Sequence, residues 1–340
     1  METARVDASD GLRVLVLHDM EGLSGQSDWR TFDFQETDLY ARGQEMLAGD
    51  INAVIDGLFA GGATAVQVVD GHGSGNPDPD VRADLLDKRA TQLLRAERFD
   101  TYFDVPESER YDAVAVVGMH AKTGSGGFAS HTFTLGIELQ INGRPITETE
   151  LVALSWGRYG VPVIFASGDD RLAADLATMP WIEFVTVKTA TSASTAEPRP
   201  VEEARADLRE GARRAVASLD DVKVMRVAEP LAATIRAVPP ASLQRLAGVP
   251  GVRFDAEANS VTFQAATLRD AYDGLEALVG IASTEYRSVL WEVLRARGLG
   301  DEMSDAYNDA LMMRWLDVES RRWSPPKPSV NTGRRYHGYQ

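Results

Sequence analysis

The chain has 340 residues, 44% of them hydrophobic and 25% charged, so it can bury a full hydrophobic core. Its 51 acidic residues against 35 lysines and arginines give a net charge of -16, which argues against a broad nucleic-acid or anionic-membrane surface. The lack of cysteine excludes disulfides, thiolate nucleophiles and iron–sulfur clusters. No uninterrupted apolar stretch reaches about 18 residues, so we expect no membrane span and a cytoplasmic protein.

Four short apolar runs in the first half of the chain are followed by polar residues, and predicted helices separate several of them. The first run, 14–17, stops at His18 and Asp19, and helical spacing over 36–59 follows it. Further runs at 65–69, 113–117 and 161–166 lead into His72, His120 and Asp169. This order predicts an α/β fold, with a mostly parallel sheet covered by helices on both faces.

Histidines and carboxylates gather just beyond these strands, where ligands bind in such sheets. Asp19 and Glu21 follow the first strand, while His72 and His120 follow the second and third. Taken singly, an Asp-x-Glu pair is better explained as a helix cap than as a pair of metal ligands. A single histidine at a strand end is likewise better explained as a hydrogen-bonded polar residue. Three such strand ends together favour a metal centre, since imidazole and carboxylate are the ligands of hydrolytic zinc, manganese or iron sites.

A hairpin is predicted over 134–146, turning at Asn142-Gly143. A helix then begins at Thr147, which forms a capping-box pattern with Glu150. Glu148 lies in its first turn, where the residues alone indicate only a carboxylate that complements the helix dipole. Asp170 has a similar interpretation, as the cap of a helix over 171–179.

The second half of the chain is less informative about chemistry. A strand over 181–187 and a helix over 201–219 complete a predicted metal-binding catalytic domain, residues 1–220. Strands over 225–238, 252–255 and 261–264 with a helix over 268–281 indicate a smaller α+β domain, residues 221–283. Residues 284–340 are expected to form a helical extension, with helices over 286–297 and 304–320, then an extended Pro-rich tail that includes His337.

At these motifs the chain resembles the self-compartmentalising zinc D-aminopeptidases, from about residue 12 to residue 283. The matching motifs are Asp19-Met20-Glu21-Gly22-Leu23-Ser24-Gly25, Asp70-Gly71-His72, Gly118-Met119-His120-Ala121, Ser130-His131, Ile141-Asn142-Gly143-Arg144-Pro145 followed by Glu148, Val161-Pro162-Val163, Gly168-Asp169-Asp170 and Val261-Thr262-Phe263-Gln264. The order and spacing of so many motifs are hard to obtain by chance.

The resemblance implies two zinc ions per chain that share Asp19. One ion would also take Glu21 and His72, and the other His120 and Glu148. The resemblance further implies that His131 is a catalytic histidine near the metals and that a ring-stacked homodecamer encloses the active sites.

Three features depart from the family pattern. His18 stands at a usually apolar or small position, where it is read as a neutral histidine bonded near the strand end. Glu150 replaces a small residue, so we consider that it enters the pocket. The extension, 286–340, is absent from relatives of ordinary length; its apolar helix faces are expected to cover a subunit contact or narrow the active-site entrance, the alternative being packing on its own small domain.

We therefore expect a dinuclear metal-dependent hydrolase that cleaves amide bonds of short peptides or amino-acid amides, an aminopeptidase acting on D-residues. Zinc is the expected metal, with manganese or iron as alternatives. Glu150 or Asp169 is a candidate for binding the substrate's α-amino group. The rival hypotheses are a dinuclear phosphoesterase, which the lack of a Gly-rich phosphate loop disfavours, and a non-catalytic assembly subunit that keeps the fold.

Overall fold

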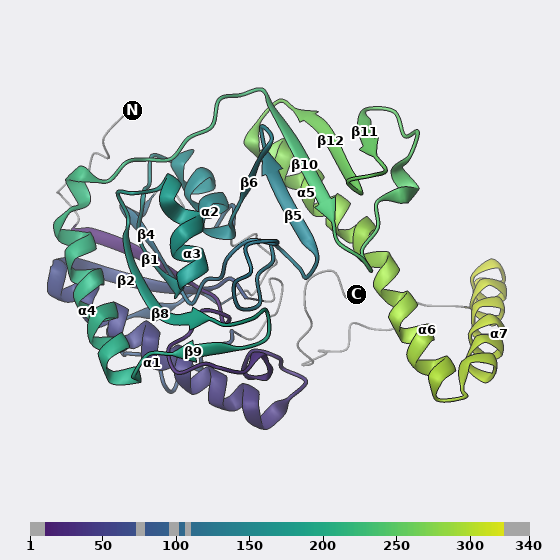
Figure 1. Cartoon of the computed structure of the whole chain (residues 1–340), viewed down its shortest axis with the longest axis horizontal. Helices are drawn as coiled ribbons and strands as arrows, with labels where there is room; N and C mark the ends of the chain where they lie inside the picture. The colour runs from purple at the N-terminus through teal and green to yellow at the C-terminus, as the bar shows by residue number, and fades with distance from the viewer. Residues whose placement is uncertain (1–10, 73–78, 95–101, 106–109, 323–340) are drawn as a thin grey trace.

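The computed structural model describes residues 11–72, 79–94, 102–105 and 110–322, and these form two β-sheets with helices around them (Figure 1). The first sheet has seven strands in the order β3-β2-β1-β4-β7-β8-β9, and the second has five in the order β11-β12-β10-β5-β6. None of the helices among the described residues is both long enough and apolar enough to cross a membrane.

The first sheet is parallel except at one edge, which confirms the predicted fold class. Its strands are β1 (Leu12–His18), β2 (Ala63–Asp70), β3 (Thr91–Gln92), β4 (Ala113–Val117), β7 (Val163–Asp169), β8 (Glu183–Ala190) and β9 (Ala196–Pro198). All neighbours pair in parallel apart from β8 and β9. The central strands β4 and β7 are buried along their whole length, as expected of continuous apolar runs covered on both faces.

Two different layers cover the faces of this sheet. Alternate residues of β1 point to opposite faces, so Val14 and Val16 pack into a core with α1 (Thr37–Gly61) and α4 (Val201–Ala217). Leu15 and Leu17 pack into a second core with α2 (Glu148–Gly157) and the second sheet. The short helix α3 (Asp170–Asp175) lies next to β7 and β8. Single 3-10 turns occur at Trp29–Thr31, Leu176–Thr178, Leu219–Asp221, Gln244–Leu246 and Ser283–Tyr286.

The second sheet is antiparallel and combines strands from distant parts of the chain. It consists of β5 (Ile137–Ile141), β6 (Arg144–Ile146), β10 (Leu231–Ala237), β11 (Val252–Asp255) and β12 (Ser260–Ala265), with α5 (Leu268–Ala282) packed against it. The predicted hairpin turn is present, with φ of 52° at Asn142 and 77° at Gly143. Because β5 pairs with β10, this sheet draws strands from both sides of the predicted boundary at residue 220. The division into domains remains a prediction.

The helical extension projects away from both sheets (Figure 1). It contains α6 (Arg287–Ala296) and α7 (Gly300–Glu319), and neither helix buries a side chain. For these two helices, packing on the chain's own small domain is therefore wrong as an explanation of their apolar faces. The predicted extended tail and His337 lie outside the described residues.

Candidate metal centre

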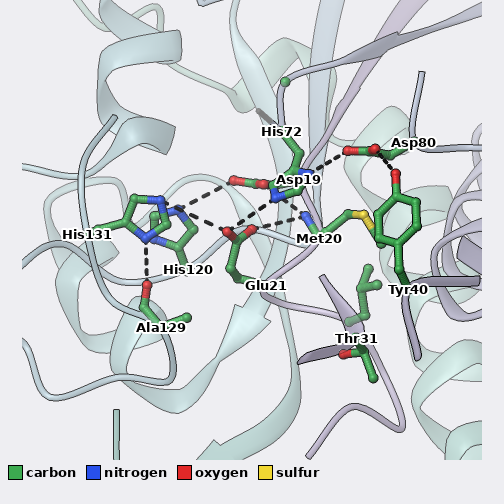
Figure 2. Close-up of polar contacts among 12 residues, drawn as sticks. Asp19, Met20, Glu21, Thr31, Tyr40, His72, Asp80, His120, Ala129 and His131 are labelled. Carbon is green, nitrogen blue, oxygen red and sulfur yellow. Dashed lines mark hydrogen bonds and ion pairs between the residues drawn. The ribbon is translucent and has the colours of Figure 1, made fainter. Parts of the chain in front are cut away.

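Three adjacent strands of the first sheet bring the predicted ligands together. Asp19 and Glu21 follow β1, His72 follows β2 and His120 follows β4, and these strands are neighbours in the order β2-β1-β4. Their carboxyl ends therefore meet at one edge, where Figure 2 shows the four side chains directed toward one another. Glu148 reaches the same place from the first turn of α2.

The five side chains form two groups of potential metal ligands that share one carboxylate. Asp19, Glu21 and His72 make one group, and Asp19, His120 and Glu148 make the other. The Nε2 atom of His72 lies 3.6 Å from Oε1 of Glu21, and Nε2 of His120 lies 3.4 Å from Oδ2 of Asp19 and 3.5 Å from Oε2 of Glu148. All five residues are only 2–4% exposed.

Burial of three carboxylates in one place perturbs every titratable group around them. Burial alone would raise the pKa of Asp19, but hydrogen bonds with His120 and Glu21 hold this pKa well below its ordinary value. Burial and the charge of Asp19 raise the pKa of Glu21. Burial would lower the pKa of His72, yet the charges of Asp80 and Glu21 raise it to about 10. The clustered carboxylates thus create a negative potential that favours positive charge at this site, either as bound protons or as a bound cation.

His131 lies beside this centre without joining either of the two groups that share Asp19. Its ring stacks on that of His120, with centroids 4.0 Å apart, and its Nε2 is 4.0 Å from Oε1 of Glu21. Its Nδ1 lies 2.6 Å from the carbonyl oxygen of Ala129 (Figure 2), so Nδ1 carries the proton and donates it to this bond. His131 also joins Glu21 and His120 in a third, alternative ligand group. Its side chain is 13% exposed, more than those of the five predicted ligands.

Burial and the nearby charge of His120 lower the pKa of His131 to about 4. Its imidazole is therefore neutral over the physiological range, with the unprotonated Nε2 directed at the centre. A neutral, more exposed histidine at the edge of a carboxylate cluster is well suited to exchange protons with a bound molecule.

Sequence reasoning missed Asp80, which orients His72. Its Oδ2 lies 2.5 Å from Nδ1 of His72, and its other carboxylate oxygen accepts a hydrogen bond from the hydroxyl of Tyr40 (Figure 2). This pattern, in which a carboxylate fixes the outer nitrogen of a histidine, is common around metal-binding histidines. Asp80 lies outside the strands and helices, and no periodic or capping signal marks it.

Three further residues that the sequence analysis did not single out support the proposed ligands. The hydroxyl of Tyr102 donates to Oε2 of Glu148 at 2.7 Å, and the backbone N–H of Phe133 donates to Oε1 at 2.7 Å. Lys188 is fully buried and its Nζ donates to the carbonyl oxygen of Glu21. The available signal for this last contact was a lysine that follows the alternating residues Val185 and Val187 in β8, where it continues a buried strand.

Close backbone approach around Met119 accounts for two glycines. A Cβ atom at Gly22 would lie 2.0 Å from the carbonyl oxygen of Met119, and one at Gly168 would lie 2.3 Å from the same atom. Neither position can accept a side chain without moving the backbone next to His120. These glycines let the ends of β1, β4 and β7 come close enough for the ligands to converge.

Two candidates for binding the substrate's amino group have structural partners instead. Glu150 completes the predicted capping box with Thr147 and also accepts a hydrogen bond from Thr178 at 2.7 Å. Asp169 caps α3, accepting from the backbone N–H groups of Arg171 and Leu172, so the prediction that Asp170 is this cap was wrong. These contacts do not support a role for either carboxylate in binding an amine.

His18 is fully buried at the end of β1, with Nδ1 3.9 Å from Oδ1 of Asp70. It belongs to neither of the two ligand groups that share Asp19, nor to the third. The geometry supports its interpretation as a histidine that packs near the strand end.

Comparisons with known proteins agree with this geometry. A family model described as D-aminopeptidase matches residues 12–277. A D-aminopeptidase of Bacillus subtilis (strain 168) is 27% identical over 270 residues, which cover 78% of this chain and 95% of the relative. Among solved structures, the Zn-dependent D-aminopeptidase DppA from Bacillus subtilis, described as a self-compartmentalizing protease, matches with a TM-score of 0.71 and 25% identity, covering 80% of this chain and 98% of that one. The chain therefore belongs to the D-aminopeptidase family.

Proposed function

We propose that this protein is a dinuclear zinc aminopeptidase that removes N-terminal D-residues from short peptides or amino-acid amides. The observation that carries the proposal is the pair of buried ligand groups sharing Asp19. Family membership over residues 12–277 supports the reaction class, and the zinc dependence of the structural relative supports the metal. No feature of the described site favours phosphate esters over amides.

The chemistry of the donor set fits two divalent ions. Asp19, Glu21 and His72 would hold one zinc, while Asp19, His120 and Glu148 would hold the other. The buried Nε2 atom of His120 faces oxygens of Asp19 and Glu148 at 3.4 and 3.5 Å, distances at the long limit for hydrogen bonds. A metal ion would satisfy this nitrogen and offset the buried negative charge.

When bound, the two zinc ions supply Lewis acidity that polarises a carbonyl group and lowers the pKa of a water molecule. His131 supplies proton transfer, because its Nδ1–H is engaged by Ala129 and its Nε2 is left to accept a proton and pass it to the leaving amine. Tyr102 and the N–H of Phe133 hold Glu148 in one orientation. Lys188 fixes the backbone of Glu21 in the same way.

The proposal includes self-assembly into a homodecamer that encloses the active sites. The description of the structural relative as self-compartmentalizing supports an assembly of copies, and the number ten rests on the family resemblance. A cytoplasmic location and the division into residues 1–220, 221–283 and 284–340 are also part of the proposal.

Metal analysis combined with a substrate panel tests the function. We expect two zinc ions per chain after dialysis, and hydrolysis of D-aminoacyl amides and short D-peptides in preference to their L-counterparts. A phosphate monoester serves as the control substrate and should not be cleaved. Two bound ions with cleavage of the phosphate ester alone would reject the peptidase assignment, and one ion or none in an active protein would reject the dinuclear centre.

A further inference from the structure

Among the residues that the structure describes, the extension carries an apolar surface that no other part of the chain covers. Along α6 and α7, including the turn between them, eleven large apolar side chains are 39–57% exposed: Val289, Leu290, Val293, Leu299, Tyr307, Leu311, Met312, Met313, Trp315, Leu316 and Val318. Together they expose on the order of 1000 Å² of apolar area, which compares with the ~800 Å² per partner of a stable protein interface.

The two helices differ in length, so α6 covers only part of α7. With ten residues α6 is about 15 Å long, while the 20 residues of α7 span about 30 Å. The rings of Trp291 and Tyr307 meet with centroids 6.4 Å apart, which places the contact in the first half of α7. The second half, from Leu311 to Val318, carries apolar side chains over most of its circumference, interrupted by Arg314 and Asp317 on one face, a pattern typical of helices buried on several sides.

An acceptor surface for such a helix lies on the outer face of α6. Val289 and Leu290, together with Leu135 and the Pro239-Pro240 turn, line an apolar groove of about 350 Å³ at the start of α6. Val293, one turn further along the helix, extends this surface and is 43% exposed. The groove and the face of α6 thus form a continuous apolar strip.

Charge indicates what covers the strip. Helix α7 carries six acidic side chains and one arginine, whereas α6 carries two arginines and one glutamate, with Arg297 directly after it. Four of these acidic residues precede Leu311. The second half of α7 carries Asp317 and Glu319 against Arg314, so it combines a wide apolar surface with a small net negative charge that complements the basic α6 strip. Each chain carries both the strip and the helix. In a pair of copies, the α7 helix of each can therefore dock on the α6 strip of the other.

We propose that the second half of α7 from one copy docks on the α6 strip of a second copy, joining subunits through a segment outside the family match. The matched residues end at 277, so this contact adds to whatever interfaces the family fold makes on its own. The occupant is the α7 helix of another copy of this chain.

The lack of cysteine allows a specific cross-linking test. Leu290→Cys with an affinity tag is mixed with untagged Met312→Cys, and a short bismaleimide joins only chains whose two cysteines approach each other. We expect a tagged–untagged product at least about tenfold above that of Ser288→Cys mixed with Met312→Cys, since Ser288 lies on another face of α6. Adding Trp315→Asp should abolish the product, and adding Asn308→Asp should not.

Several outcomes would overturn the proposal. A cross-linking yield equal to that of the Ser288→Cys control would show that α7 of one copy does not contact α6 of another. A cross-link that is absent from the full chain and appears only in a chain ending at Arg322 would assign the strip to residues 323–340 instead. Because the readout is a covalent product and not hydrolysis, the result is independent of the proposed enzymatic activity.

Discussion

Replacing Asp80 tests whether the second layer of the centre holds its metal. Asp80→Asn keeps the size of the side chain but removes the negative charge 2.5 Å from Nδ1 of His72. Loss of such an outer partner typically weakens metal binding 10- to 100-fold, or about 1.4–2.7 kcal/mol. We expect this loss for one of the two ions, because Asp80 contacts His72 and His72 belongs to only one ligand group.

The measurement is zinc affinity for each of the two ions, by competition with a chelator at fixed pH. Asp84→Asn is the matched control, because this substitution removes the same charge from the same segment. Asp84 is exposed and pairs with Arg82. Asp80→Ala should weaken the same ion more than Asp80→Asn does, because it also removes the hydrogen-bond acceptor. If both Asp80 variants bind zinc with affinities within about threefold of the control, Asp80 does not support His72 as a ligand. A threefold change is smaller than the 10- to 100-fold loss expected when an outer partner of a metal ligand is removed.

Four further predictions follow from the site. Asp19→Ala should lose both ions together, whereas His120→Ala should weaken mainly one, as elemental analysis will show; equal, mild losses would contradict the shared ligand. His131→Ala should keep its zinc and lower kcat by about 100-fold or more, and loss of zinc would make His131 a ligand instead. Gly22→Ala should destabilise the fold by roughly 2 kcal/mol or more in denaturant titration, because its Cβ would lie 2.0 Å from the Met119 carbonyl oxygen; unchanged stability would contradict the close approach. A chelator should lower Tm, by an amount equivalent to about 4 kcal/mol when zinc was present at a thousandfold its Kd, and an unchanged Tm would argue against metal bound to the native state.

Local signals in the sequence explain the elements that were predicted well. The apolar run 113–117 coincides with β4, because a short, β-branched apolar run that ends at a glycine favours a strand buried on both faces. The turn at Asn142-Gly143 and the capping box of Thr147 with Glu150 were also found as expected. Each of these patterns acts over a few residues, so it can be read without knowing the fold.

Features that depend on distant parts of the chain were missed or misplaced. No local pattern indicates that β5 pairs with β10, about ninety residues later, since both partners are ordinary amphipathic strands. The predicted strand over 225–238 begins only at Leu231, where its pairing with β12 starts. Asp80 was overlooked because its significance depends on its distance to His72 in space.

Glu148 illustrates the limit of pattern reading at the centre itself. Its position in the first turn of α2 indicated only a dipole effect, and the family resemblance was needed to propose it as a ligand. The structure brings it to 3.5 Å from Nε2 of His120, a relation between a helix start and a strand end that spacing does not encode. The ligand roles of all five residues stay predictions until metal is measured.

The pairing of β5 with β10 has a consequence for how the protein is made. Four of the five proposed ligands lie within the first 120 residues and on neighbouring strands, so they leave the ribosome early. Glu148 follows a hairpin whose partner strand, Leu231–Ala237, is synthesised much later. Since chains begin to fold from the N-terminus during translation, the nascent protein passes through a stage with one ligand group complete and the other unsupported. Metal loading would then be sequential, with the second ligand group supported only after Leu231–Ala237 has been synthesised.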